Sequence, residues 1–80
     1  MVDVIFNEHF KRIFKKIKDE SLKEEIIIQI SKLKNQPTLG KPMRYTRKGT
    51  RELYVSPYRL SYKVEGDCIY IIDLYHKDEQ

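Results

Sequence analysis

The residues of this chain best suited to chemistry are the cationic and aromatic side chains between Lys41 and Lys63. This stretch holds seven of the sixteen Lys and Arg residues, four tyrosines and a single carboxylate, Glu52. Lysine and arginine bind phosphate oxygens, and flat rings stack on bases. The stretch therefore indicates contact with a nucleic acid. The residues predicted to bind RNA are Lys41, Arg44, Arg47, Lys48, Tyr54 and Lys63.

The same residue types are compatible with RNA cleavage. RNA carries its own nucleophile, the 2′-hydroxyl, so an RNase must align that oxygen, stabilise charge on the phosphate and protonate the leaving 5′-oxygen. Arginine suits the second task because its planar fork binds phosphate through two hydrogen bonds. A lysine or histidine can supply the proton. Spacing alone, however, favours Arg59 as a solvated strand arginine or a partner of Glu52.

Other chemistries have little support in the sequence. His9 and His76 fall on different predicted elements, and no pair of cysteines or histidines has the spacing of a metal site. Cys68 opens an apolar segment, where a free cysteine usually behaves as a small hydrophobic residue. We therefore expect neither a metal nor another cofactor.

Length and charge set the general class of protein. A chain of 80 residues supports one hydrophobic core, so residues 1–80 are predicted to form a single domain. The formal net charge of +4 favours anionic partners. The sequence has one cysteine, no signal-peptide pattern and no apolar run long enough to span a membrane. We therefore predict a cytoplasmic protein that does not contact membranes.

Two helices are predicted in the first half, after a short strand over residues 1–6. Asn7 is a suitable N-cap for the first helix, whose apolar residues recur at the helical spacing of Phe10, Ile13, Phe14 and Ile17. Ser21 and Glu24 have the spacing of a capping box, which predicts a second helix that starts near residue 21 and stops by about residue 36. Its inner face is predicted to contain Leu22, Ile26, Ile30 and Leu33. Ile28 lies off that face, either exposed or widening it towards a partner.

The second half changes to the twofold alternation of β-strands. A turn over residues 37–42 precedes predicted strands at 50–55, 58–64 and 68–75. Arg59 should point away from Leu60 and Tyr62, and most tyrosines are expected in the sheet core or in cross-strand pairs. The order β-α-α-β-β-β predicts an α+β fold, with a small antiparallel sheet and a helical hairpin on one of its faces.

Several segments resemble the RelE side of the RelE/ParE toxin superfamily. The resemblance covers nearly the whole chain and is most specific in the predicted strand at residues 58–64, with its Tyr-Arg-Leu-x-Tyr sequence. The matching segments are Leu39-Gly40-Lys41-Pro42, Leu53-Tyr54-Val55, Tyr58-Arg59-Leu60-Ser61-Tyr62-Lys63-Val64 and His76-Lys77-Asp78-Glu79. The resemblance implies a type II toxin that cleaves messenger RNA in the ribosomal A site. It also implies a protein antitoxin as partner, with a heterotetramer as one possible assembly.

The resemblance also implies roles for single residues. Arg59 corresponds to the family's transition-state arginine, and Lys77 stands where the family usually has an arginine. His76 beside it is either a proton donor or an exposed structural histidine. Glu52 and Tyr54 occupy the region where active members carry strand lysines, with Arg51 and Lys48 close by. The predicted catalytic set is therefore Arg59, Lys77, His76 and Arg51.

Two alternatives follow from the same departures. One is a ParE-like toxin that inhibits a topoisomerase by binding and cleaves nothing. The other is a family member without catalysis that binds only antitoxin or RNA.

Overall fold

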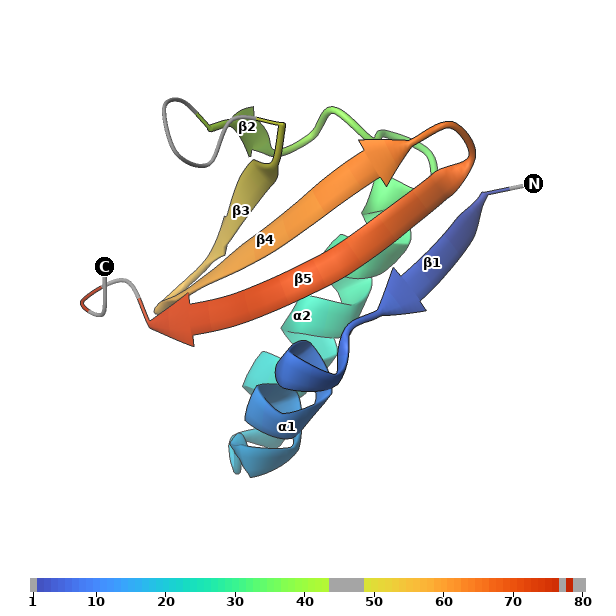
Figure 1. Cartoon of the computed structure of the whole chain (residues 1–80). Helices are drawn as coiled ribbons and strands as arrows, with labels where there is room; N and C mark the ends of the chain where they lie inside the picture. Colours follow the sequence, from blue (N-terminus) through green and yellow to red (C-terminus); the bar gives the residue numbers. More distant parts are fainter. Residues whose placement is uncertain (1, 44–48, 77, 79–80) are drawn as a thin grey trace.

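The structure, a computed structural model, describes residues 2–43, 49–76 and 78. Along the chain the elements are β1 (Asp3–Phe6), α1 (Glu8–Lys16), α2 (Glu20–Leu33), β2 (Lys41–Pro42), β3 (Arg51–Val55), β4 (Tyr58–Glu65) and β5 (Cys68–His76). Both helices lie on one side of the sheet (Figure 1). Within the described residues no helix covers the other side, which we call the open face. The predicted α+β fold is confirmed.

The five strands form one mixed sheet in the order β1-β5-β4-β3-β2. The predicted antiparallel meander is present, because β4 pairs antiparallel with both β3 and β5. The structure adds two pairings that the sequence pattern did not reveal. β1 pairs parallel with β5, and the short β2, in the region predicted as a turn, pairs with β3. Pro42 has no N–H for a ladder, which fits its place on an edge strand.

The N-cap of α1 is the predicted one, whereas the N-cap of α2 differs from the prediction. The Asn7 side chain accepts hydrogen bonds from the backbone N–H of His9 and Phe10, as predicted. For α2 the predicted cap at Ser21 is wrong. Asp19 is the N-cap, and its carboxylate accepts a hydrogen bond of 3.2 Å from the backbone N–H of Leu22. Because Asp19 satisfies this donor two residues earlier, Ser21 lies inside the first turn.

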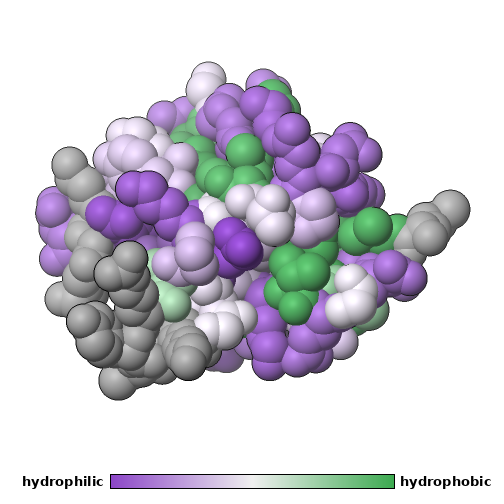
Figure 2. All heavy atoms as spheres, turned by 90° about the horizontal axis from the view of Figure 1, so that it is seen from above, coloured by the Kyte–Doolittle hydropathy of each residue, from purple (hydrophilic) through white to green (hydrophobic). Residues whose placement is uncertain are grey.

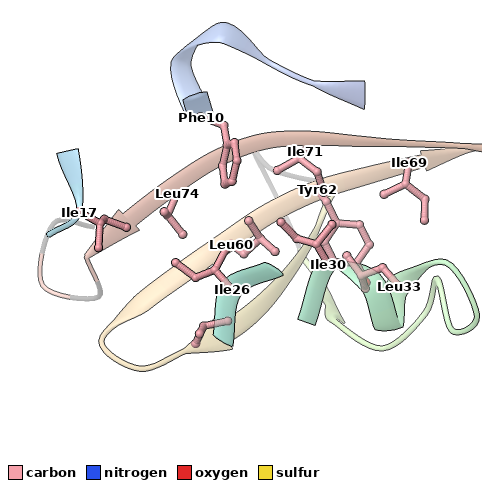
Figure 3. Close-up of a cluster of buried hydrophobic side chains, with 11 residues drawn as sticks. Phe10, Ile17, Ile26, Ile30, Leu33, Leu60, Tyr62, Ile69, Ile71 and Leu74 are labelled. Atoms are coloured by element: carbon pink, nitrogen blue, oxygen red, sulfur yellow. The ribbon is translucent and has the colours of Figure 1, made fainter. Parts of the chain in front are cut away.

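The hydrophobic core lies between the helices and the sheet (Figure 3). Its buried members are Phe10, Ile17, Ile26, Ile30, Leu33, Val55, Leu60, Tyr62, Ile69, Ile71 and Leu74. Full burial of an aliphatic or aromatic side chain contributes about 1.5–3 kcal/mol. The predicted inner face of α2 is confirmed at Ile26, Ile30 and Leu33, whereas Ile28 is 48% exposed.

Strand alternation assigns Arg59 to the open face. Neighbouring residues of a strand point to opposite sides of the sheet, and the next residue, Leu60, is fully buried against the helices. The pairing of β4 with β5 shifts between Ser61 and Tyr62, so that Ile72 has no partner residue in β4. This irregularity lies beyond Arg59, whose pairing with both neighbouring strands is regular.

Candidate nucleic-acid interface

Arg59 lies at the centre of a row of three residues across the open face. Its cross-strand partners are Tyr54 on β3 and Tyr75 on β5. The guanidinium carbon is 5.6 Å from the centre of the Tyr54 ring, within the range of a cation–π contact. Tyr54 is 50% exposed, so its ring is accessible to a ligand. This row combines a phosphate-binding fork with an accessible flat ring.

Glu52 contacts two members of this row, Arg59 and Tyr75. Its side chain is 5% exposed, and Oε1 lies 3.8 Å from Nη1 of Arg59. The Tyr75 hydroxyl donates a hydrogen bond to the other carboxylate oxygen, Oε2. A buried carboxylate is strongly destabilising unless charges and hydrogen bonds compensate it. Glu52 therefore joins β3, β4 and β5, and restricts the positions of Arg59 and Tyr75.

A cleft of about 620 Å³ opens beside this row. Lys41 and Met43 line it from the β2 side, and Glu52, Tyr54 and Arg59 line it from the sheet. The Arg59 side chain is 37% exposed, and its Nε has no hydrogen-bond partner among the described residues. The cleft therefore brings two cations and a tyrosine ring to one concave surface, where a phosphate and a base could bind together.

The wall of this cleft that carries Lys41 is fixed to the sheet by Tyr62. The Tyr62 hydroxyl donates to the Pro37 carbonyl and accepts from the Gly40 N–H, each at 2.8 Å. Gly40 approaches so closely that an added Cβ would lie 2.7 Å from the Glu52 carbonyl oxygen and 2.8 Å from the Tyr62 ring. Burial raises the pKa of Tyr62, while the Gly40 hydrogen bond and the Arg51 charge oppose that rise.

Arg51 and His76 lie on the helix side of the sheet, away from Arg59. Strand alternation puts Arg51 on the face of Leu53, and its Nη1 donates to the Gly40 carbonyl at 2.8 Å. His76 packs edge-on against Tyr58, with ring centres 5.7 Å apart. The structure therefore does not bring these two predicted catalytic residues to Arg59.

The remaining predicted residues divide into two groups. Lys41 lines the cleft with Tyr54, and Lys63 lies on the open face further along β4, with Nζ 2.7 Å from Oε1 of Glu65. The other predicted positions, Arg44, Arg47, Lys48 and Lys77, lie outside the described residues.

Sequence reasoning did not find the contact between Tyr75 and Glu52. The two residues are 23 positions apart, and their strands are not adjacent in the sheet. The register puts Tyr75 opposite Arg59 and Glu52 opposite Ser61, two residues further along β4, so the contact depends on the alignment of three strands. The one feature of the sequence that pointed to Tyr75 was its position at the end of the predicted strand at residues 68–75.

The described residues contain neither a candidate metal site nor a membrane-spanning helix. No group of three potential metal-binding side chains occurs among residues 2–43, 49–76 and 78. Over the same residues, no helix has the length and apolar character needed to span a membrane.

Solved structures of bacterial toxins have the same fold. The toxin–antitoxin complex RelBE2 of Mycobacterium tuberculosis matches with a TM-score of 0.81 and 24% identity, over 95% of this chain and 98% of that chain. The YoeB–YefM complex of Staphylococcus aureus matches with a TM-score of 0.82 and 15% identity, with the same coverage. The isolated RelE toxin of E. coli matches with a TM-score of 0.80 and 15% identity, over 100% of this chain and 88% of that chain. No curated protein sequence matches. The fold is therefore that of the RelE/YoeB class of toxins.

The sequence itself identifies the family. The family model for the ParE toxin of type II toxin–antitoxin systems, parDE, matches residues 4–80. The chain belongs to this family and is a toxin of the RelE/ParE superfamily.

Proposed function

We propose that this toxin cleaves messenger RNA on the ribosome and thereby inhibits translation. The observation that carries the proposal is the cleft in which Arg59 lies over the exposed ring of Tyr54 and shares the surface with Lys41. An arginine fork binds the non-bridging oxygens of a phosphate, while a tyrosine ring stacks on a base. The cleft thus offers contacts to both parts of one nucleotide.

The proposed reaction needs no metal. The 2′-hydroxyl loses its proton to solvent as its oxygen attacks the adjacent phosphorus, the bond to the 5′-oxygen breaks, and a 2′,3′-cyclic phosphate forms. Arg59 stabilises the negative charge that develops on the phosphate, an electrostatic role of the kind that often contributes most to catalysis. Glu52 is a positioning residue, because its buried carboxylate contacts Arg59 and Tyr75.

The leaving 5′-oxygen must receive a proton. We assign this step to Lys77, which directly follows the end of β5 at His76. Tyr75, two residues earlier, flanks Arg59 in the register of the sheet. His76 is the second candidate for this proton, although its ring packs against Tyr58 on the helix side of the sheet.

An antitoxin partner is part of the proposal. The S. aureus YoeB–YefM toxin–antitoxin complex, which shares the fold, is described as heterotetrameric. We propose that this chain also binds a protein antitoxin, with a heterotetramer as one candidate assembly. Action on ribosomes would require the toxin to work in the cytoplasm.

Expression in bacteria tests the proposal. Wild-type chain should arrest growth and produce new 5′ ends in mRNA on ribosomes, as mapped by primer extension, and Arg59→Ala should do neither. Arg12→Ala, which removes an exposed arginine on α1, is the matched control and should behave as wild type. Wild-type chain that yields no mRNA cuts would contradict the proposal.

A second candidate function is inhibition of a topoisomerase without cleavage. The observation that favours it is the ion pair of Arg59 with Glu52, which reduces the positive charge available to a phosphate. Gyrase supercoiling in the presence of the purified chain separates the two candidates. Unaffected supercoiling would exclude the second.

A further inference from the structure

The open face carries a second pairing of a cation with a tyrosine. Lys63 on β4 is the cross-strand partner of Tyr70 on β5, which in turn pairs with Ile5 on β1. A hollow of about 430 Å³ lies over these residues. Its lining includes the Lys63 and Tyr70 side chains, together with Ile5, Asn7, Glu65 and Ile72. The hollow thus combines a flat ring, aliphatic surface and an ammonium group.

This hollow lies on the same side of the sheet as the cleft at Arg59. Arg59 and Lys63 are four residues apart on β4, so strand alternation gives them the same side. At about 3.3 Å per residue, they are about 13 Å apart along the strand. A stacked nucleic-acid strand advances about 3.4 Å per nucleotide, so about four nucleotides would span this distance.

The groups in the hollow match a nucleotide in type. The pKa of Tyr70 is raised, mainly through the charge and hydrogen bond of Cys68, so the phenol is neutral near pH 7 and does not repel phosphate. The hydrogen bond from Lys63 to Glu65 raises the pKa of Lys63, which keeps the ammonium charged. Glu65 is exposed, so a phosphate could displace it from Lys63.

We propose that the hollow at Lys63 and Tyr70 is a second nucleotide subsite, which binds a base and a phosphate of the single-stranded RNA held at Arg59. Tyr70 stacks on the base, and Lys63 contacts the phosphate. The inference rests on the proposed function, because it extends the same RNA-binding face. It predicts that one RNA strand runs along the open face of β4, with one nucleotide bound at Arg59 and another at Lys63.

Binding of the full chain to short RNAs tests the subsite. Fluorescence anisotropy would compare a dinucleotide with an octanucleotide, both 2′-O-methylated so that they cannot be cleaved. Tyr70→Leu keeps an apolar side chain on the strand but removes the ring, and it should weaken octanucleotide binding about tenfold, the scale of one lost base stack. Tyr70→Phe should bind as wild type.

Two charge variants complete the experiment. Lys63→Ala should weaken octanucleotide binding and reduce its salt dependence, because one phosphate contact is lost. Glu65→Gln should strengthen it, because it frees Lys63 from its carboxylate partner. Each of these variants should change dinucleotide binding less than octanucleotide binding, because a dinucleotide is too short to reach both subsites at once and Arg59 can still bind it.

The outcomes separate this inference from the proposed function. Octanucleotide binding that falls in Arg59→Ala but not in the Tyr70 and Lys63 variants would overturn the subsite and leave the function standing. Wild-type chain that does not bind the octanucleotide would also overturn the subsite, and mRNA cuts on ribosomes would then decide the function independently. Equal loss of dinucleotide and octanucleotide binding in Tyr70→Leu would contradict a separate second site.

Discussion

Glu52 and Arg59 form an ion pair between β3 and β4 in which one member is buried and the other is open to solvent. The Glu52 side chain is 5% exposed and the Arg59 side chain 37%, and Oε1 of Glu52 lies 3.8 Å from Nη1 of Arg59. Glu52, the single carboxylate between Lys41 and Lys63, therefore contacts Arg59, the arginine at the centre of the row on the open face. The same contact that positions Arg59 also partly offsets the attraction of its positive charge for a phosphate.

Removal of the Glu52 charge should strengthen RNA binding. Glu52→Gln keeps the side-chain shape and an oxygen that can accept the Tyr75 hydrogen bond, while it frees the Arg59 charge. We expect about fivefold tighter binding of single-stranded RNA, equivalent to about 1 kcal/mol, because Arg59 is partly solvated and its pair is correspondingly weak. Anisotropy titrations measure the effect.

Glu24→Gln is the control for this change, since it removes the same charge from an exposed site on α2. It should leave binding within error of the wild type. If both variants bind equally tightly, the gain comes from net charge and the Glu52–Arg59 pair has no specific role.

The caps of α2 give a direct test of local structure. Asp19→Ala removes the acceptor for the Leu22 N–H and should lower the free energy of unfolding by about 1 kcal/mol. Ser21→Ala, inside the first turn, should cost little or nothing, since alanine is the better helix former. Urea denaturation of the two variants measures the difference. A larger loss in Ser21→Ala would show that the helix begins at residue 21 in solution.

Tyr62 should make stability fall at alkaline pH. Its pKa in the folded state is raised by burial above the ordinary value of about 10, so the folded state binds the phenol proton more tightly than the unfolded state. The contribution of Tyr62 is therefore fully present below about pH 10 and is lost as pH rises through the folded pKa.

Tyr62→Phe separates this effect from that of the other ionisable groups. Near pH 7 it should lower the free energy of unfolding by about 1–3 kcal/mol, because the Pro37 carbonyl and the Gly40 N–H lose their partner. Above about pH 10 the gap between the variant and the wild type should narrow. Urea denaturation across this pH range measures it, and a gap that widens with pH would contradict the assignment.

Periodicity was sufficient to predict both helices and the strands β1, β3, β4 and β5. The apolar spacing of α2 predicted Ile26, Ile30 and Leu33 in the core, and strand alternation predicted opposite directions for Arg59 and Leu60; both are confirmed. The parallel pairing of β1 and the short β2 depend on contacts distant in sequence, which local patterns do not encode.

The site was less predictable than the fold. Arg59 and Tyr54 could be assigned to one surface, because alternation fixes the side of each strand on which a residue lies. The same alternation puts Arg51 on the side of Leu53, away from Arg59, so its place in the predicted catalytic set came from the family resemblance and not from the strand pattern. For His76 the pairing with Tyr58 decides, and it puts His76 on the helix side. The contacts of buried Glu52 with Arg59 and Tyr75 likewise depend on how β3, β4 and β5 align. The sequence of a single strand does not show that alignment.

Cleavage of a defined mRNA on purified ribosomes with an empty A site tests the central claim most directly. We predict that wild-type toxin cuts the A-site codon in a single turnover, that Arg59→Ala is slower by about 100-fold or more because an electrostatic stabiliser of the transition state is lost, and that Arg12→Ala cuts at the wild-type rate. Equal rates for wild type and Arg59→Ala, or no cleavage by the wild type, would contradict the account.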